Sequence, residues 1–378
     1  MRILLGITGG IAAYKAAGLL RAMSELGHDV TALPTQNALR FIGEATLEAL
    51  SGKNIDPELY GDVASVRHVQ LGQEADLIVV APATAAFLGR YAAGIADDLL
   101  LNALLASTAP VVVVPAMHTE MWQNQATIEN VETLRSRGIR VMQPASGRLT
   151  GEDTGPGRLP EVEEIIDFLF AASPLTGKTV TVTAGGTRER IDDVRFIGNR
   201  SSGKTGVALA IAARDLGAKV HLIACNLSQT PKGIEVSHVE SVTELSAALQ
   251  KPADVLVMAA AVSDFQVVNP HKGKLSRSTV PELELSSSPD LLAAYTKKFP
   301  ESFAVGFALV DQGEDLIEAS RGKLEAKGAK VVIGNSIGSL EGNDTAVQYV
   351  DAESATEITG SKGDVAREIM RRVAAQLS

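Results

Sequence analysis

Two glycine-rich turns in this 378-residue sequence have the residue types that bind anions. The first, Gly6-Ile7-Thr8-Gly9-Gly10-Ile11, lies between a strand-like apolar run and a helical pattern. Glycine lets the backbone approach a ligand, and the free N–H groups of a helix start attract negative charge. The G-x-G-x-x-G pattern of dinucleotide binding is missing, and the next strand ends in Leu33-Pro34-Thr35 without an acidic residue. The phosphate of a flavin therefore fits better than a dinucleotide, and a tight turn that binds nothing is the alternative.

The second turn matches a known phosphate-binding pattern letter for letter. Gly198-Asn199-Arg200-Ser201-Ser202-Gly203-Lys204-Thr205 fits the P-loop consensus G-x-x-x-x-G-K-[ST]. A true P-loop follows directly on a buried strand, whereas the apolar run 179–183 ends well upstream and the polar stretch 187–193 lies between. We therefore expect a loop rich in amides and cations that leads into a helix over 203–216. Such a loop still favours a phosphate, without being the P-loop of an ATPase.

The elements that must position the first turn alternate as in a doubly wound α/β domain. Apolar, β-branched runs separated by stretches of helical spacing are typical of a parallel sheet covered by helices on both faces. We predict strands over 2–8, 28–34, 77–81, 111–115 and 140–142, and helices over 10–26, 39–50 and 161–170. The predicted first domain, residues 1–173, is thus flavodoxin-like or Rossmann-like.

The same alternation restarts after a short segment of small and polar residues. Residues 171–177 (AASPLTG) are predicted to be a linker. Strands are predicted over 179–183, 218–224, 254–259, 303–307, 330–334 and 346–350, and helices over 203–216 and 364–376. The second domain, residues 174–378, is therefore also predicted to be a doubly wound, Rossmann-like α/β domain with a parallel sheet.

Composition excludes several classes of protein. The chain has 35 Lys and Arg residues against 45 Asp and Glu, a net charge of −10, which disfavours a nucleic-acid surface. Its apolar runs are too short to span a bilayer, so no membrane association is expected. The single cysteine, Cys225, cannot form an intrachain disulfide, and no signal-peptide pattern is present. A cytoplasmic protein is expected.

Several separate runs resemble known families. Residues 182–188 (VTAGGTR), 194–204 (VRFIGNRSSGK), 258–265 (MAAAVSDF) and 305–308 (VGFA) are similar to motifs of bacterial phosphopantothenoylcysteine synthetase domains. In the first half, residues 8–15 (TGGIAAYK), 81–84 (APAT), 115–117 (PAM) and 121–122 (MW) resemble flavin-dependent cysteine decarboxylases. Because both halves are covered in this order, the chain resembles the bifunctional coenzyme A biosynthesis enzymes. His118 and the run Arg148-Leu149-Thr150-Gly151 resemble the actinobacterial version of that enzyme.

The resemblance implies two consecutive reactions. CTP transfers CMP to the carboxylate of 4′-phosphopantothenate, pyrophosphate leaves, and the amine of L-cysteine attacks the acyl cytidylate. FMN then oxidises the CH2–SH group of the product to a thioaldehyde, which accepts the electrons left by CO2, and the reduced flavin returns a hydride. The implied cofactors are FMN and Mg²⁺, the latter held mainly by phosphate oxygens and water, so that no protein ligand is required.

The decarboxylase resemblance also implies roles for particular residues. His68 matches the catalytic histidine and would assist deprotonation of the substrate thiol, a role that suits imidazole because it ordinarily titrates near neutral pH. Without the surrounding motifs, His68 would be interpreted as a surface or helix-capping residue. The implied flavin contacts are Gly9, Gly10, Thr35, Ala81, Pro82, Thr84 and Met117.

Two positions depart from the decarboxylase pattern. His118 follows Pro-Ala-Met, where the family commonly has an asparagine that holds the substrate carboxylate. Gly151 stands in the substrate-recognition flap where a cysteine often donates the final proton. Cys225 lies in the other domain and cannot be assumed to replace it. Our hypothesis is that His118 binds the carboxylate or donates the proton.

The ligase resemblance implies a set of cations and donors around the activated carboxylate. Asn199 would hydrogen-bond the acyl group, Arg195 would assist the second half-reaction, and Lys274 would neutralise the triphosphate, although Lys272 lies nearby. Ser288 stands where asparagine is usual, and Lys323 and Lys327 could instead form a solvated helix face. The implied CTP contacts are Met258, Ala259, Ala260, Asp264, Lys274, Ser288, Pro289, Asp290, Phe307, Lys323 and Lys327.

Two alternative functions stay open at the level of the sequence. One is a P-loop nucleotide hydrolase fused to a flavodoxin-like domain, which would hydrolyse ATP or GTP without cysteine. The other is a flavin-binding regulatory module whose first half has lost its chemistry. The resemblance further implies a homo-oligomer, since trimeric decarboxylases and dimeric ligases combine into assemblies such as a dodecamer.

Overall fold

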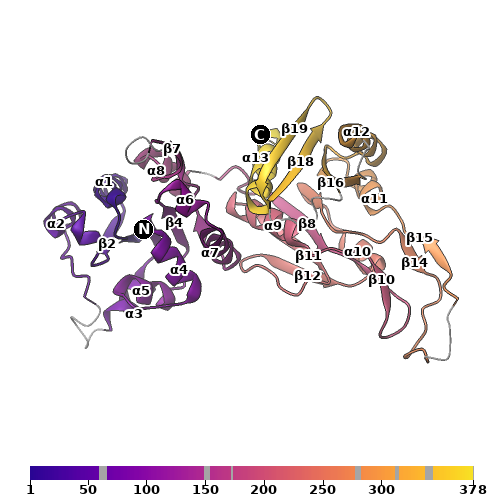
Figure 1. Cartoon of the computed structure of the whole chain (residues 1–378), viewed down its shortest axis with the longest axis horizontal. Helices are drawn as coiled ribbons and strands as arrows, with labels where there is room; N and C mark the ends of the chain where they lie inside the picture. Colours follow the sequence, from indigo (N-terminus) through magenta and orange to yellow (C-terminus); the bar gives the residue numbers. More distant parts are fainter. Residues whose placement is uncertain are drawn as a thin grey trace. The chain divides into compact units, whose positions relative to one another are not determined.

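The computed structural model describes residues 1–58, 66–148, 154–171, 173–276, 282–310, 315–336 and 344–377 (Figure 1). The chain forms two compact units, Met1–Ala171 and Ala172–Ser378. Each unit is an α/β domain built on its own mainly parallel sheet, which confirms the predicted fold class.

The sheet of the first unit has five strands in the order β2-β1-β3-β4-β5, all parallel. The strands are β1 (Arg2–Ile7), β2 (Asp29–Pro34), β3 (Leu77–Ala83), β4 (Val111–Pro115) and β5 (Arg140–Val141). Side chains of β1 alternate between two cores: Ile3 and Leu5 pack in one, and Leu4 packs in the other. Both faces are buried, which is why the strands are continuous apolar runs.

Helices cover both faces of this sheet. On one face α1 (Ala16–Glu25) and α8 (Val162–Phe170) pack against each other and contribute to the core that contains Ile3. The other face is covered by α4 (Ala85–Ala93), α5 (Leu99–Ala106) and α7 (Gln125–Ser136). The remaining elements are η1 (Ile11–Lys15), η2 (Ala38–Arg40), α2 (Glu44–Ser51), α3 (Arg67–Glu74), α6 (Thr119–Trp122), β6 (Ala145–Arg148) and β7 (Thr154–Arg158).

The sheet of the second unit has eight strands in the order β12-β11-β8-β13-β16-β17-β18-β19. Six are parallel: β8 (Thr179–Gly185), β11 (Lys219–Cys225), β12 (Glu235–Val239), β13 (Val255–Met258), β16 (Phe303–Val310) and β17 (Val331–Ser336). The last two extend one edge of the sheet: β18 (Asp344–Asp351) pairs antiparallel with β17, and β19 (Ala355–Ser361) pairs antiparallel with β18.

Helices again lie on both faces, and two hairpins stand outside the main sheet (Figure 1). One core contains residues of α9 (Lys204–Asp215) and α13 (Lys362–Gln376), and the other contains residues of α10 (Val242–Ala248), α11 (Leu291–Lys298) and α12 (Leu316–Lys327). The hairpins are β9 (Arg188–Arg190) with β10 (Phe196–Gly198), and β14 (Phe265–Val267) with β15 (Leu285–Ser287). β14 also contacts β9, so the two hairpins are neighbours.

Three predicted elements differ in detail from the structure. The helix expected over 10–26 begins as the 3-10 turn η1, and the helix expected over 39–50 is interrupted before α2 by the extended backbone of Gly43. The expected linker 171–177 is not wholly a linker, because Leu175 is fully buried in the second unit and its N–H donates to the carbonyl oxygen of Leu216 at 2.9 Å.

The P-loop-like segment lacks the context of a P-loop, as the sequence predicted. Within the described residues, β10 pairs only with β9, antiparallel and outside the parallel sheet. Gly203, in the left-handed conformation (φ 70°), then caps the start of α9. In the described part of the chain, no helix is both long and apolar enough to cross a membrane.

Gly185 gives a test of the close packing at the end of β8. Its φ is +94°, and an added Cβ would lie 2.0 Å from the carbonyl oxygen of Cys225. Gly185→Ala should lower the free energy of unfolding of the second unit by about 1–3 kcal/mol, because neither the backbone nor the neighbouring strand can accommodate a methyl group. Urea unfolding, followed by hydrogen exchange of the β11 amides, measures the change.

Gly322 is the matched control. It lies within α12, and a Cβ added there would have no neighbouring atom within 4 Å. Gly322→Ala should therefore be neutral or stabilising by about 0.5–1 kcal/mol. Equal effects at the two positions would contradict this account of Gly185.

Candidate active sites

The first candidate site lies where the winding of the five-stranded sheet reverses. β1 pairs with β2 on one side and β3 on the other, so the chain segments that follow β1 and β3 diverge at the carboxyl edge. Thr8 ties these segments together: its Oγ1 donates to the carbonyl oxygen of Pro82 at 2.8 Å and accepts the N–H of Thr84 at 3.0 Å. A buried hydroxyl thus fixes both edges of the opening.

A cavity of about 270 Å³ lies at this reversal. Of the predicted flavin contacts, Gly9, Thr35 and Thr84 line it. A Cβ on Gly9 would lie 2.4 Å from Cβ of Asn37, so only glycine allows this close approach. The other lining residues are Thr8, Pro34, Gln36, Asn37, Pro57, Ala86, Phe87, Arg90, Asp97, Asp98, Leu99, Leu100 and Leu101. The lining combines an apolar wall with a few polar groups, as small-ligand sites do.

The remaining predicted flavin contacts are not among the residues that line the cavity. Ala81 is fully buried in the core, and the carbonyl oxygen of Pro82 accepts the Thr8 hydrogen bond. The N–H of Ala13 donates to Gly10 at 2.9 Å, and the N–H of Met117 donates to Gly157 at 2.9 Å. These residues shape the loops around the site, and their contact with a cofactor stays a prediction.

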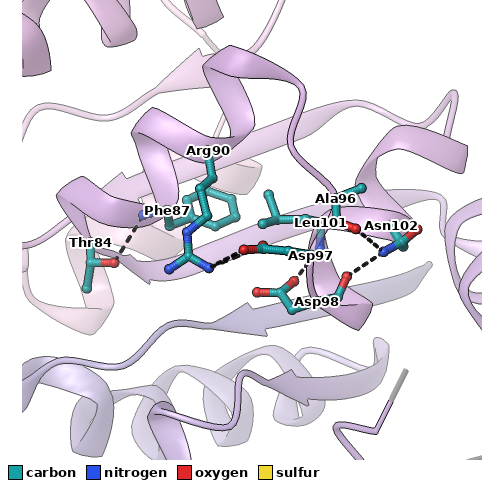
Figure 2. Close-up of polar contacts among 8 residues, drawn as sticks. All are labelled: Thr84, Phe87, Arg90, Ala96, Asp97, Asp98, Leu101 and Asn102. Atoms are coloured by element: carbon teal, nitrogen blue, oxygen red, sulfur yellow. Dashed lines mark hydrogen bonds and ion pairs between the residues drawn. The ribbon is translucent and has the colours of Figure 1, made fainter. Parts of the chain in front are cut away.

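Arg90, Asp97 and Asp98 line the cavity and were not predicted (Figure 2). Nη1 of Arg90 lies 3.2 Å from Oδ1 of Asp97, an exposed ion pair at the cavity. Asp98 caps α5, and its Oδ1 accepts the N–H of Leu101 at 2.8 Å. Burial raises the pKa of Asp98, and its cap hydrogen bond opposes this only in part. An aspartate directly before an apolar helix is an N-cap signature, so the sequence held a signal for this residue.

The two predicted catalytic histidines lie outside the lining of this cavity. His68 is half-buried on α3, next to Arg67, whose Nη1 lies 2.7 Å from Oδ2 of Asp56. His118 is exposed at the start of α6 and makes no side-chain cap bond. Gly151, the position that departs from the expected flap cysteine, lies outside the described residues. The structure therefore leaves the roles of His68 and His118 as predictions.

The second candidate site lies at the corresponding reversal in the eight-stranded sheet, between β8 and β13. The N–H of Ala261 donates to Gly185 at 2.8 Å, and the N–H of Ala260 donates to Oγ1 of Thr183 at 3.0 Å. Asn199 joins the same region, because its Nδ2 donates to the carbonyl oxygen of Val262 at 3.0 Å. The structure thus connects the predicted residue Asn199 to Val262, which lies just beyond the predicted segment Met258–Ala260.

A cavity of about 300 Å³ opens next to Asn199. The guanidinium of Arg188 stacks over the ring of Phe196 at 4.5 Å. The lining of the cavity is rich in hydrogen-bond donors and comprises Gly186, Arg188, Phe196, Gly198, Asn199, Arg200, Ser201 and Asn226. Guanidinium and amide groups in one cavity suit an anionic ligand. Apart from Asn199, none of these residues had been predicted to form the site.

A third group of predicted residues gathers beyond β13 and β16. Nζ of Lys327 pairs with the carboxylate of Asp290, which also caps α11, and Nζ of Lys323 donates to the carbonyl oxygen of Phe307. Burial lowers the pKa of Lys323 and the charge of Lys327 lowers it further, whereas Asp290 and Asp264 oppose the shift. Neither lysine is therefore a freely solvated helix side chain.

The neighbouring predicted residues are linked through the backbone. The N–H of Ser288 donates to the carbonyl oxygen of Asp264 at 2.9 Å, and Pro289 lies between Ser288 and Asp290. Burial acts to raise the pKa of Asp290, but hydrogen bonds from Lys327 and from the Ala293 N–H lower it below its ordinary value.

The last two predicted residues are cations near the hairpins. Arg195 lies in the turn between β9 and β10, and its Nη1 is 2.8 Å from Oδ2 of Asp192. Lys274 is exposed on the segment that follows β14. Asp192, a buried carboxylate, was not recognised from the sequence.

Comparison with known proteins places the chain in a family. Residues 1–173 match the family model described as Flavoprotein, and residues 175–377 match the model described as DNA/pantothenate metabolism flavoprotein C-terminal domain. The chain is 45% identical over 404 residues to the coenzyme A biosynthesis bifunctional protein CoaBC of Mycolicibacterium smegmatis. The alignment covers 100% of this chain and 98% of that protein. The chain belongs to the bifunctional CoaBC family.

A second full-length CoaBC protein gives the same assignment. The protein of Mycobacterium tuberculosis strain H37Rv is 46% identical over 397 residues, which cover 98% of this chain and 95% of that protein. A crystal structure of the C-terminal domain of a CoaBC protein is 30% identical, covers 54% of this chain and 98% of that one, and has a TM-score of 0.46. The family resemblance that the sequence motifs indicated is confirmed.

Asp98 yields a pH-dependent prediction for the flavoprotein unit. Asp98→Asn should stabilise this unit at pH 7, because asparagine caps a helix equally well and carries no charge to bury. Since burial raises the pKa of Asp98 in the folded state, ionised Asp98 costs stability above that pKa. The stability gained by Asp98→Asn should therefore shrink as the pH falls toward 3.8, the pKa of this carboxyl group in the unfolded chain. Thermal unfolding across this pH range measures it.

The adjacent exposed aspartate is the control. Asp97→Asn removes a surface ion pair with Arg90 and a nearby charge that contributes to the raised pKa of Asp98, so it should change stability by only about 0–1 kcal/mol. A gain for Asp98→Asn that does not depend on pH would contradict the assigned cause.

Proposed function

We propose that this chain joins L-cysteine to 4′-phosphopantothenate at the expense of CTP, through an acyl cytidylate, and then decarboxylates the product with FMN to 4′-phosphopantetheine. The observation that carries the proposal is family membership over the full length of the chain, with both domain types present in the order of the CoaBC proteins. The first domain has a cavity at the reversal of its sheet, and the second has a cavity lined by residues that follow β8 and β11, so each half-activity has a candidate location.

In the ligase unit, the donor-rich cavity is the proposed site for the anionic acid substrate. Its two guanidinium groups, Arg188 and Arg200, would hold the phosphate, because planar guanidinium groups match phosphate geometry. Asn199 would then hydrogen-bond the carboxylate that becomes activated, beside the Met258–Ala260 segment. Fixed donors of this kind stabilise charge that develops on the acyl and phosphoryl oxygens.

CTP is the proposed ligand of the neighbouring cationic group. Lys323 and Lys327, with Lys274, would neutralise the triphosphate, and Asp264 and Asp290 would hold the lysine ammonium groups in place before the nucleotide arrives. Mg²⁺ is expected to accompany CTP through phosphate oxygens and water. Arg195 would assist when the amine of cysteine attacks the acyl cytidylate.

In the flavoprotein unit, the residues around the first cavity fit FMN. Gly9 leaves room that a Cβ would fill, Thr35 and Thr84 offer hydroxyl groups, and Phe87 and Leu99–Leu101 provide an apolar wall. FMN, when bound, supplies the reversible two-electron oxidation that makes loss of CO2 possible. His68 would remove the proton of the substrate thiol, and His118 would hold the carboxylate or donate the final proton. We further propose a cytoplasmic homo-oligomer, of which a dodecamer is one arrangement.

Separate variants should interrupt the two reactions at different products. With 4′-phosphopantothenate, cysteine, CTP and Mg²⁺, His68→Asn should accumulate phosphopantothenoylcysteine, since loss of a general base costs about 10²–10⁴-fold in rate. Asn199→Asp should instead block amide formation, and so should Lys274→Gln, at a cost of about 10²-fold or more. Mass spectrometry of the products distinguishes these outcomes.

His238 provides a matched histidine control, because it is exposed on β12 and lies in neither cavity lining. His238→Asn should form 4′-phosphopantetheine at the normal rate. The assignment of activities to the two units would be wrong if His68→Asn blocked amide formation while Asn199→Asp blocked decarboxylation.

A further inference from the structure

Asp192 is a buried carboxylate in the turn of the β9–β10 hairpin, with only 2% of its surface exposed. Its Oδ1 accepts the N–H groups of Val194 at 2.8 Å and Arg195 at 2.6 Å. Its Oδ2 accepts Nη1 of Arg195 at 2.8 Å and the N–H of Leu275 at 3.1 Å. Four donors therefore converge on one side chain, which can only accept.

The surroundings of Asp192 keep it ionised. Burial acts to raise its pKa, but the N–H groups of Val194, Leu275 and Arg195, with the charge of Arg195, lower the pKa to about 2. A carboxylate with these partners carries a full negative charge at every pH at which the enzyme would work. Its hydrogen bonds are therefore of the stronger, charge-assisted kind.

The contact with Leu275 is one of several hydrogen bonds between two segments that are far apart in the sequence. The N–H of His271 donates to the carbonyl oxygen of Ile191 at 2.9 Å, and the N–H of Gly273 donates to Oδ2 of Asp193 at 2.9 Å. Nη1 of Arg195 also reaches the carbonyl oxygen of Leu275 at 3.4 Å. The turn 191–195 and the segment 271–275 are thus joined along their length.

These hydrogen bonds fix the backbone on both sides of Lys274. Gly273 is held by Asp193 and Leu275 is held by Asp192, whereas the side chain of Lys274 is exposed. Arg195 is held at its backbone and at its guanidinium, yet 45% of its side chain remains exposed. One buried anion therefore anchors two cations that still face solvent, where substrates arrive.

We propose that Asp192 is a positioning residue of the ligase unit, which holds Arg195 and the Lys274 segment in one fixed arrangement. The inference rests on the proposed function for what these two cations do. A long cationic side chain contributes most to catalysis when its geometry is set before the charge develops, because no reorganisation is then needed. Asp192 touches neither substrate in this proposal and acts only through the residues that it holds.

The first test compares the same change at two adjacent positions. Asp192→Asn removes the charge and, in either orientation of its amide, sets an NH2 group against two of the four donors, so the hydrogen bonds that hold Arg195 and Leu275 should weaken. CTP-dependent joining of cysteine should fall about 10- to 100-fold, the scale of a misplacement of about 1 Å. Asp193→Asn keeps an oxygen for the Gly273 N–H and leaves the contacts of Asp192 in place, so it should lower joining much less, by no more than about threefold. Decarboxylation by the same chain should not change.

A double-mutant cycle separates positioning from general damage. Lys274→Gln and Arg195→Gln should each lower the joining rate much less in the Asp192→Asn background than in the wild-type chain, because the anchor is already lost. Multiplicative effects of the paired changes would overturn the proposal. So would full joining activity in Asp192→Asn.

Amide hydrogen exchange gives a readout that does not depend on activity. Asp192→Asn should accelerate exchange at Val194, Arg195 and Leu275, and any effect of Asp193→Asn should be confined to Gly273. Unchanged exchange at Leu275 would overturn the tether itself. If the tether is seen but the wild-type chain consumes no CTP, the proposed function fails and the structural role of Asp192 stands, so the two failures are distinguishable.

Discussion

The reversal of winding in a parallel sheet is the constraint on which both candidate sites depend. Where successive strands are added first on one side and then on the other, the loops beyond the carboxyl ends diverge and leave an opening. In the first unit the opening lies between β1 and β3, and in the second between β8 and β13. The first cavity lies at such a reversal, whereas the cavity of the second unit is lined by residues that follow β8 and its neighbour β11, and in both units the residues beyond the strands decide what can bind.

Those residues differ in a way that suits the two proposed ligands. The first cavity has Phe87 and Leu99–Leu101 in its wall, so it can cover the ring of a cofactor that stays bound. The second is lined by Arg188, Arg200 and amide groups, so it suits anions that enter and leave in every cycle. Close packing at the strand ends is common to both, with glycine at Gly9 and Gly185 where a Cβ would collide with neighbouring atoms.

The sequence predicted the parallel strands because their burial on both faces makes them continuous apolar runs. It also predicted that Gly198–Thr205 is not a P-loop, because a polar stretch separates it from β8. The added β19 edge strand was not predicted, since it is partly exposed and only its pairing with β18 makes it a strand. Helix 10–26 was predicted as one element because a 3-10 turn and an α-helix share nearly the same apolar spacing.

Site residues were predictable where a family motif is contiguous and less so where tertiary contacts create the site. Asn199 belongs to a contiguous motif and hydrogen-bonds Val262, just beyond the motif segment Met258–Ala260. Arg90 and Asp97 approach each other across a helix and a loop, and Asp192 gains its role from Leu275, so no local pattern identifies them. His68 and His118 belong to recognisable motifs, but their place relative to a ligand depends on a bound substrate.

The most direct test of the central claim is an experimental density map of the full chain with FMN and CTP bound. We predict density for the flavin at the β1–β3 reversal, against Gly9, Thr35 and Thr84. Density for CTP should lie beyond β13 and β16, against Met258–Ala260, Asp290 and Lys323. Well-defined density for either nucleotide away from these residues would contradict the account.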